Sequence, residues 1–355
     1  MGTGMFVGTL KHLPEPDREQ LTIEAITTEA VTTSEIEGEF LDRASVQSSI
    51  RKQLGLATDK RRVGPAEEGI SKMMVALYRS FAKPLSNEML YSWHRLLFAE
   101  RGSLIGAGHY RKGKEPMEIV SGPIHAPKVH YEAPPSSKVT KEMARFVDWF
   151  NRTAPAGAEP LPALTRAGIA HLYFESIHPF EDGNGRIGRA ISGKALAQCF
   201  GRPDLTALAP AILSRRKAYY AALQAASKTN KLTAWLSWFA GIAIEAQRRT
   251  TARTEFLIEK TRLLDRLRGQ LNPRQEKALL RMLREGPEGF KGGLSAGNYV
   301  TITGASAATA TRDLADLVDK NALVREGERR HARYHIAIPT TKVSPVILDK
   351  NGSFM

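Results

Sequence analysis

The chain has 355 residues, a formal net charge of +14 and a single cysteine. This length suggests two or three domains, one cysteine excludes a scaffold of intramolecular disulfides, and the basic excess favours acidic partners such as nucleotides, nucleic acid or acidic protein surfaces. No apolar run reaches about 18 residues and the N-terminus does not read as a signal peptide, so we expect no membrane association and a soluble, cytoplasmic protein.

Helical patterns dominate the first part of the chain. Apolar residues recur at helical spacing from Leu21 onward, and the pattern stops at Gly38, a residue type common just after a helix. We therefore expect a helix over about 21–38. Further amphipathic helices are expected over residues 71–81, 86–98, 138–152 and 163–177.

One segment breaks the helical pattern. Residues 117–132 contain two short β-like pieces, MEIVS and KVHYE, on either side of a Gly-Pro turn. This arrangement predicts a β-hairpin that projects from a helical body. The edge of such a hairpin can pair with an extended stretch of another protein through backbone hydrogen bonds.

The string HPFEDGNGRIGR occupies residues 178–189. Gly183, Gly185 and Gly188 spell the G-x-G-x-x-G pattern of dinucleotide-binding folds, which requires a β-strand immediately before it. A helix and a turn precede it here, and no Gly-Lys-Ser/Thr follows, so both this fold and the P-loop are disfavoured.

The chemistry of these residues points elsewhere. Residues 182–185 can form a tight turn at the start of a helix, where backbone amides bind anions. Arg186 and Arg189 share one helix face, so both can reach the same anion. Asp182 offers a hard oxygen ligand for Mg²⁺ when phosphates supply the others, and His178 can accept a proton near neutral pH. Together they predict phosphoryl or nucleotidyl transfer.

The string HPFEDGNGR followed by Arg189 resembles the Fic family signature, His-Pro-Phe-x-Asp/Glu-Gly-Asn-Gly-Arg-x-x-Arg, at every specified position. Members of that family are helical and usually transfer AMP from ATP to a protein hydroxyl. The resemblance implies that His178 deprotonates the target hydroxyl and that Asp182 holds Mg²⁺ between the α- and β-phosphates. The nucleotide-binding residues that it implies are Gly183, Asn184, Gly185, Arg186 and Arg189.

The resemblance extends to the surroundings of the signature. Doc relatives that act as kinases carry a lysine where this chain has Gly185, which favours AMP transfer. The hairpin corresponds to the family's flap, which docks the target protein. Its docking residues are Ile119, Val120 and Ser121. A Tyr-Tyr pair helps line the nucleoside site in the family, which assigns Tyr219 and Tyr220 to the pocket, although such a pair on a helix is otherwise typical of a core.

The string TTSEIEG at residues 32–38 resembles the family's inhibitory motif, Ser/Thr-x-x-x-Glu-Gly/Asn, with Thr33, Glu37 and Gly38 in register. In such members the glutamate pairs with the second arginine of the signature, here Arg189, and ATP then sits in an unproductive pose. The position before the signature is that of the subclass with its inhibitor at its own N-terminus. Some inhibited relatives also use this glutamate to remove AMP, and the sequence leaves that activity open.

The C-terminal part changes character. A helix is expected over residues 272–286, and two more helical patterns follow, separated by a turn at Gly304. Residues 322–338 then alternate as strands around a basic turn. Three helices and a hairpin are the layout of a winged helix-turn-helix.

The partner of this module is left open between DNA, protein and a second copy in a homodimer. Its candidate recognition helix, 306–319, carries one strong cation, Arg312. The wing adds Arg325, Arg329, Arg330, His331 and Arg333. The acids that dilute this charge are Asp313, Asp316 and Asp319. Basic wings often contact phosphates, while many winged helices bind proteins.

The sequence thus predicts a mainly α fold, a Fic-type helical bundle with a β-hairpin flap and a C-terminal winged helix-turn-helix domain. The expected parts are an N-terminal helical region (1–80), a Fic catalytic core (81–245), a helical linker (246–270), a winged helix-like domain (271–340) and a tail (341–355).

The expected function is transfer of AMP from Mg²⁺-bound ATP to a Ser, Thr or Tyr hydroxyl of a target protein, self-modification included, held back by Glu37. The alternative is a DNA-binding regulator whose Fic core senses nucleotide. The intact His178 and Asp182 argue against a pure sensor, which needs no base. A kinase-like donor use is disfavoured by Gly185.

Overall fold

The computed structural model describes residues 15–59, 61–99, 106–113, 117–121, 128–203, 206–229, 231–290, 292–339 and 343–348. Two compact units divide the described residues. The first comprises Arg18–Gln247 with residues 345–348, and the second Arg248–Ser344 with residues 15–17. Among the described residues, no helix has both the length and the apolar character needed to cross a bilayer.

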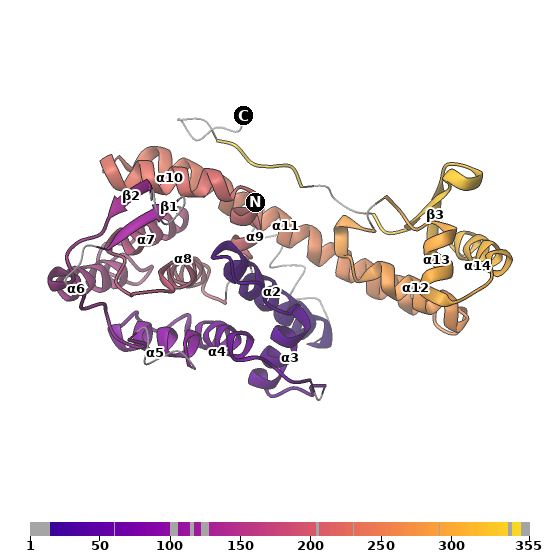
Figure 1. Cartoon of the computed structure of the whole chain (residues 1–355), viewed down its shortest axis with the longest axis horizontal. Helices are drawn as coiled ribbons and strands as arrows, with labels where there is room; N and C mark the ends of the chain where they lie inside the picture. The colour runs from indigo at the N-terminus through magenta and orange to yellow at the C-terminus, as the bar shows by residue number, and fades with distance from the viewer. Residues whose placement is uncertain are drawn as a thin grey trace. The chain divides into compact units, whose positions relative to one another are not determined.

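The first unit is a helical bundle with one two-stranded sheet (Figure 1). Its helices are α2 Glu15–Ile36, α3 Arg43–Leu54, α4 Pro65–Ser80, α5 Asn87–Leu97, α6 Ser136–Arg152, α7 Ala163–Ile177, α8 Asn184–Phe200, α9 Leu208–Ser214, α10 Arg216–Thr229 and the first part of α11 Leu232–Arg266. The helices predicted over 86–98, 138–152 and 163–177 are confirmed to within two residues at each end. The one predicted over 71–81 begins earlier, at Pro65.

The sequence did not predict α3. Asp42 caps this helix by accepting a hydrogen bond from the Ser45 amide at 2.9 Å, a signal that was present in the sequence. Serines, including Ser48 and Ser49, occupy much of its buried face, where a helical pattern would show apolar residues. The helix is therefore hidden from a search for hydrophobic periodicity.

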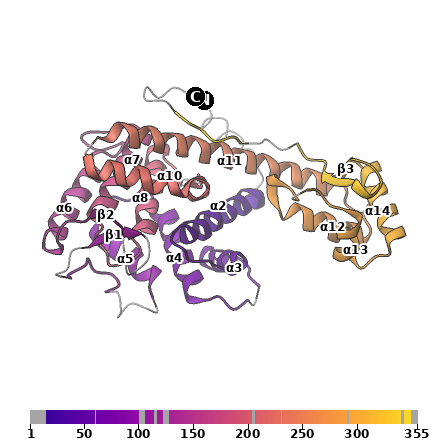
Figure 2. The same cartoon turned by 45° about the horizontal axis from the view of Figure 1, so that its top comes forward.

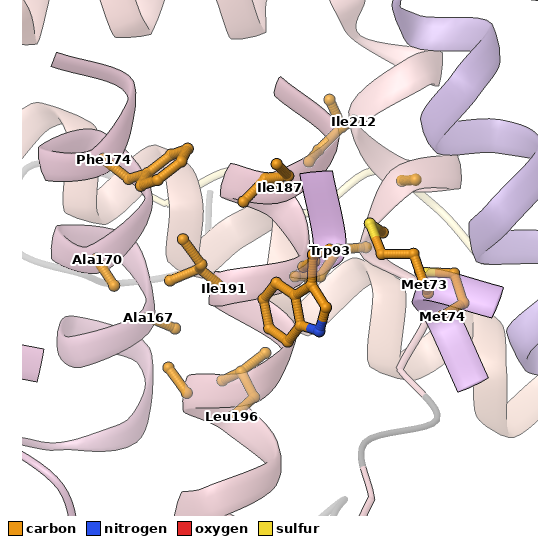
Figure 3. Close-up of a cluster of buried hydrophobic side chains, with 14 of the residues drawn as sticks. Met73, Met74, Trp93, Ala167, Ala170, Phe174, Ile187, Ile191, Leu196 and Ile212 are labelled. Atoms are coloured by element: carbon orange, nitrogen blue, oxygen red, sulfur yellow. The ribbon is translucent and has the colours of Figure 1, made fainter. Parts of the chain in front are cut away.

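The core of the first unit is built around α8, which packs along α7 (Figure 2) and also contacts α4, α5 and α9. Figure 3 shows the side chains that fill the α7–α8 interface, namely Ala167, Ala170 and Phe174 of α7 with Ile187, Ile191 and Leu196 of α8. Trp93 of α5 and Met73 of α4 belong to the same cluster. Each large side chain buried here contributes about 1.5–3 kcal/mol. This packing holds the end of α7 beside the start of α8, where residues 178–183 connect them.

The predicted hairpin is confirmed in its two strands, β1 Glu118–Ser121 and β2 Lys128–Glu132. They pair antiparallel, with a register shift between Ile119 and Val120. The turn at residues 122–127 lies outside the described residues, as do the side chains of both strands except Glu132. Ile119, Val120 and Ser121 are therefore placed on β1 by their backbone alone, and their docking role stays a prediction.

The second unit has its own hydrophobic core and follows the order predicted from the sequence, three helices and then a hairpin. Its elements are the end of α11, α12 Pro273–Leu283, the short η1 Gly286–Glu288, α13 Ala296–Thr303, α14 Ala307–Asp319, β3 Leu323–Glu326, η2 Arg329–His331 and β4 Arg333–Ile336. Leu294 adds an isolated bridge to Tyr334 beside the hairpin. Assignment to the winged-helix class remains a prediction.

The predicted tail, 341–355, is not loose throughout. Val346 is only 3% exposed, and its carbonyl accepts a hydrogen bond from Arg215 Nη1 at 3.0 Å. Its amide lies 3.3 Å from a carboxylate oxygen of Glu245, which is fully buried on α11. A buried carboxylate needs such donors, so this part of the chain is anchored on the first unit.

Candidate active site

His178 lies directly after the last turn of α7. Its backbone takes the left-handed conformation, with φ of 49°, and its amide still donates to the Phe174 carbonyl at 3.0 Å. Arg111 holds the residues that follow, because its Nε donates to the His178 carbonyl at 2.8 Å and its amide to the Pro179 carbonyl at 2.9 Å. The imidazole is therefore presented from a backbone fixed on both sides.

The turn after His178 is held by side chains in its interior. Phe180 is fully buried and anchors the turn, and its ring stacks on His94 with centroids 4.1 Å apart. Asn184 bridges the turn, since its Nδ2 donates to the Phe180 carbonyl at 2.8 Å and its Oδ1 accepts from the Phe180 amide at 2.9 Å. The buried Asn184 side chain is thus committed to the turn, so only its backbone remains for the predicted nucleotide contact.

The start of α8 has the features of an anion-binding site. Gly183, with φ of 78°, precedes the helix, and no side chain caps the first turn. A Cβ on Gly183 would approach the Phe98 ring to 2.7 Å, and one on Gly185 would lie 2.1 Å from Glu37 Oε1. The carboxylate of Glu37 therefore lies against the first turn of α8, where the positive end of the helix dipole favours an anion.

Arg189 is enclosed by the end of α2. Its side chain is 1% exposed, its Nε donates to Thr33 Oγ1 at 2.7 Å, and its Nη2 donates to Glu37 Oε1 at 2.6 Å and to the Thr33 carbonyl at 2.9 Å. Burial alone would lower the pKa of Arg189, but Glu37, with Tyr219 and Glu175, outweighs it and the pKa is raised. Gly38 follows with φ of 86°, so the predicted motif and Arg189 meet as the resemblance implies.

Arg186 has a carboxylate partner that sequence reasoning missed. Its Nη1 donates to Glu39 Oε2 at 2.7 Å, while its guanidinium lies 5.0 Å from the centre of the Phe98 ring and its Nη2 lies 3.9 Å from Asp182 Oδ1. The Arg186 side chain is 8% exposed. Glu39 stands two residues after Glu37, and only this spacing could have suggested that the end of α2 supplies an acid to each arginine.

The imidazole of His178 has an acidic neighbour, Glu175, one turn earlier on α7. The distance from His178 Nδ1 to Glu175 Oε2 is 3.8 Å. Burial lowers the pKa of His178 to about 4, below the near-neutral value expected from the sequence. Burial, and then the charge of Glu37, raise the pKa of Glu175 to about 8, with Arg189 opposing. The three-residue spacing was the available signal for Glu175, because it places this residue one turn before His178 at the end of the helix.

Asp182 suits a metal that is shared with phosphate oxygens. Its side chain is 60% exposed, and Oδ1 accepts a hydrogen bond from the Gly183 amide at 2.5 Å. Among the described residues, no group of three His, Cys, Asp or Glu side chains could hold a metal by itself. Mg²⁺ commonly binds through one or two carboxylates plus phosphates, so the residues present fit it only together with a nucleotide. A cavity of about 520 Å³ adjoins Asp182, lined also by Arg186, Phe98 and Glu39.

The structure separates the two predicted pocket tyrosines. Tyr219 is 1% exposed and its hydroxyl lies 2.8 Å from His171 Nε2, so it is a core residue here rather than part of a pocket wall. Tyr220 is 41% exposed, and its hydroxyl donates weakly to the Ile36 carbonyl at 3.4 Å. Only Tyr220 lies at the surface beside the end of α2, because α10 turns the two side chains to different faces.

Comparison with known proteins gives matches in two parts of the chain. Residues 84–196 match the family described as Fic/DOC, and residues 1–56 match a domain of unknown function (DUF4172). A stretch of 91 residues is 35% identical to a relative described as protein adenylyltransferase fic-1 from Caenorhabditis briggsae. That stretch covers 25% of this chain and only 16% of the relative.

Solved structures share the fold. A Fic family protein from Desulfovibrio desulfuricans G20 matches with a TM-score of 0.51 and 22% identity, over 90% of this chain and 89% of that one. A Fic domain containing signaling protein from Bacteroides thetaiotaomicron VPI-5482 matches with a TM-score of 0.54 and 17% identity, over 70% of this chain and 95% of the other. At these identities the likeness concerns the fold alone.

Proposed function

This chain is a Fic family protein with its Fic domain over residues 84–196, and from this premise we propose that it transfers AMP from ATP to a hydroxyl of a target protein. The observation that carries the proposal is the convergence of His178, Asp182, Arg186 and Arg189 around the uncapped start of α8. This convergence supplies a base, a metal ligand and two cations beside one anion site.

In the proposed reaction His178 takes the proton of the target Ser, Thr or Tyr hydroxyl. The hydroxyl oxygen then bonds to the α-phosphorus of ATP, the bond from that phosphorus to the bridging oxygen breaks, and pyrophosphate leaves. Arg186, Arg189 and the amides at the start of α8 hold the phosphates and offset the developing charge. Asp182 would hold Mg²⁺, which when bound supplies further charge stabilisation at the phosphate oxygens.

We propose that the arrangement described here is the inhibited one. Glu37 occupies Arg189, and Glu39 occupies Arg186, so both cations are paired before a nucleotide arrives. The Glu37 carboxylate also lies against the first turn of α8. Binding of the outer phosphates in a productive pose would then require the end of α2 to move away.

The target protein would dock on the hairpin. An extended segment could pair with the edge of β1, at Ile119, Val120 and Ser121, through backbone hydrogen bonds. Such pairing reads the backbone of the partner and not its sequence, so it is compatible with modification of this chain as well as of other proteins.

The proposal is tested with α-³²P-ATP and Mg²⁺, in buffer and in cell lysate. We expect Glu37→Gly protein to label itself or lysate proteins far more than wild type, and Glu37→Gly/His178→Ala protein to give no label. General-base removal costs about 10²–10⁴-fold, which is easily resolved by this assay.

The matched control is Glu35→Gly, which places the same helix-weakening residue two positions earlier on α2. It should leave labelling at the wild-type level if the carboxylate of Glu37 is what inhibits. Equal labelling by wild type and Glu37→Gly would contradict autoinhibition, and label that survives His178→Ala would contradict the assigned base.

A second candidate function concerns the C-terminal unit. On α14 the acids Asp313 and Asp316 are paired with Arg274 and Lys320, so they weigh less against an anionic partner than the sequence suggests. Arg312 is exposed on the same helix. A DNA-binding regulator would retain duplex DNA in a salt-dependent way and show no AMP transfer even as Glu37→Gly. AMP transfer by that variant would reject the sensor-only reading.

A further inference from the structure

Glu175 is a buried carboxyl group that the proposed reaction has not yet used. It is 9% exposed, and its Oε2 lies 3.8 Å from Nδ1 of His178. A Cβ on Gly188 would lie 2.5 Å from Glu175 Oε1, so the glycine within the signature leaves room for this carboxyl group between α7 and α8. The carboxyl group is thus wedged between the catalytic imidazole and the backbone of α8.

Two atoms of this pair lack regular partners. Within the described part of the chain, neither His178 Nδ1, which faces Glu175 Oε2, nor Glu175 Oε1, which lies toward Gly188, makes a regular hydrogen bond. The backbone of Glu175 is close enough to the imidazole to oppose the lowering of the His178 pKa by burial. Leaving a buried polar atom unpaired costs about 1–3 kcal/mol, so a purely structural role is a poor explanation for a carboxyl group here. Its position fits a group that acquires its partner in another state of the site.

The charged groups around Glu175 determine whether its carboxyl group is protonated. The groups that act on Glu175 are Glu37, just after α2, and Arg189 from α8, with His178 directly after α7 and Tyr219 from α10 close by. Burial and Glu37 raise the pKa of Glu175 to about 8, so at neutral pH its carboxyl group is protonated here. Loss of Glu37 removes a charge that raises this pKa and leaves Arg189, which lowers it.

The two forms of Glu175 have opposite effects on the base. A protonated carboxyl group can donate to Nδ1, and the imidazole then carries its hydrogen on Nε2, which cannot accept a proton. A carboxylate instead accepts a hydrogen bond from Nδ1–H, which leaves the lone pair on Nε2 and makes the imidazole more basic. A base with a pKa nearer to neutral is also the more efficient one.

We propose that Glu175 is a positioning residue for His178, and that once the end of α2 leaves Arg189 the Glu175 carboxylate accepts the Nδ1–H of His178 and directs a bare Nε2 toward the target hydroxyl. In this change Glu175 passes its proton to Nδ1, and the hydrogen on Nε2 leaves to solvent. The inference rests on the proposed AMP transfer. It adds that Glu37 restrains the base as well as the second arginine.

The kinetic test compares Glu37→Gly protein with Glu37→Gly/Glu175→Gln and Glu37→Gly/Glu175→Asp between pH 5.5 and 9. We expect glutamine to lower kcat by about 10–100-fold with the KM for ATP changed less than twofold, since such orienting partners have effects of that size. The acidic limb of the kcat profile should move to lower pH, because His178 loses a neighbouring negative charge. Aspartate, which keeps the charge, should recover part of kcat.

The charge-matched control is Glu37→Gly/Glu142→Gln, which removes an acid on α6 that pairs with Arg145. It should leave kcat and the pH profile unchanged. An unaltered kcat with Glu175→Gln would overturn the proposal, and so would a loss confined to the KM for ATP, which would place Glu175 in nucleotide binding.

A second readout does not need turnover. In ¹⁵N-histidine-labelled Glu37→Gly protein, NMR titration should show the pKa of His178 about one unit higher than in Glu37→Gly/Glu175→Gln protein. Equal titration of His178 in the two proteins would overturn the positioning role. If Glu37→Gly shows no AMP transfer, the proposed function fails, while this titration still decides whether Glu175 acts on His178.

Discussion

Each unit of the molecule contains a buried charged side chain that connects several elements. The two side chains differ in how many of their polar atoms have hydrogen-bond partners. In the C-terminal unit, Asp313 of α14 accepts hydrogen bonds from Arg274, Tyr299 and Asn272, so that both of its oxygens are paired. In the first unit, Arg189 donates to Thr33 and Glu37 but leaves Nη1 without a partner.

The surroundings sharpen this difference. Among the described residues, every buried side-chain atom that lacks a hydrogen bond belongs to the first unit, and half of them lie in or beside the site, on Glu175, His178, Arg186 and Arg189. A fully paired group specifies a fold, whereas unpaired buried groups raise the free energy and persist where a ligand or another state uses them. The Asp313 cluster therefore reads as structural and the Arg189 cluster as functional.

Breaking the satisfied cluster should have the largest effect on stability. Asp313→Ala removes the shared acceptor of Tyr299 and Arg274, and we expect the C-terminal unit to lose about 3 kcal/mol. Hydrogen exchange of α12 and α14 in the full chain measures this loss. Asp319→Ala, an exposed acid on the same helix, should change the exchange free energy by less than about 0.5 kcal/mol. Comparable effects of the two changes would remove the structural reading of Asp313.

The unpaired groups around Arg189, Glu175 among them, should instead make the free energy of unfolding depend on pH. Because the pKa of Glu175 is raised to about 8 in the folded chain, its contribution to stability is fully present below its unfolded pKa near 4.5 and is lost as pH rises through 8. With allowance for local relaxation, we expect wild type to lose about 2 kcal/mol more than Glu175→Gln between pH 5 and pH 9. Urea unfolding of both proteins at several pH values measures this difference. The titration of all other groups cancels when the two proteins are compared. Parallel curves would mean that Glu175 is ionised in the folded chain.

The buried tyrosine should matter more for stability than its exposed neighbour. Tyr219→Phe leaves His171 without its hydroxyl partner, which is expected to cost about 1 kcal/mol. Tyr220→Phe removes a long contact to the Ile36 carbonyl and an interaction with Arg216 at the surface, and should change the unfolding free energy by less than about 0.5 kcal/mol. Thermal unfolding of the two variants side by side tests the assignment of one tyrosine to the core and the other to the surface.

Much of this arrangement could be predicted because its signals are local. The helices α5 to α7 follow from apolar spacing, and the turn at residues 182–185 follows from its glycines. For Glu39 and Glu175 the sequence offered only their spacing to Glu37 and His178, because their importance arises when α2 and α7 meet α8. The burial of the α3 serines and the anchoring of Val346 could not be predicted for the same reason. Burial there is determined by tertiary packing rather than by the local sequence pattern.

The smallest expected effect concerns the second acid at the end of α2. The pair of Glu39 and Arg186 is partly open to water, with the Glu39 side chain 37% exposed, so its contribution should be screened and modest. We expect Glu39→Gln to tighten ATP binding by about threefold, which corresponds to roughly 0.7 kcal/mol.

Calorimetry with ATP and Mg²⁺ measures this change, with Glu37→Gly as the reference and Glu35→Gln as the charge control. The gain from Glu39→Gln should shrink in 0.5 M salt more than the gain from Glu37→Gly, because Arg189 is 1% and Glu37 30% exposed, against 8% and 37% for Arg186 and Glu39. A larger effect of Glu39→Gln than of Glu37→Gly would reverse the order of the two contacts and make Arg186, rather than Arg189, the arginine on which release depends.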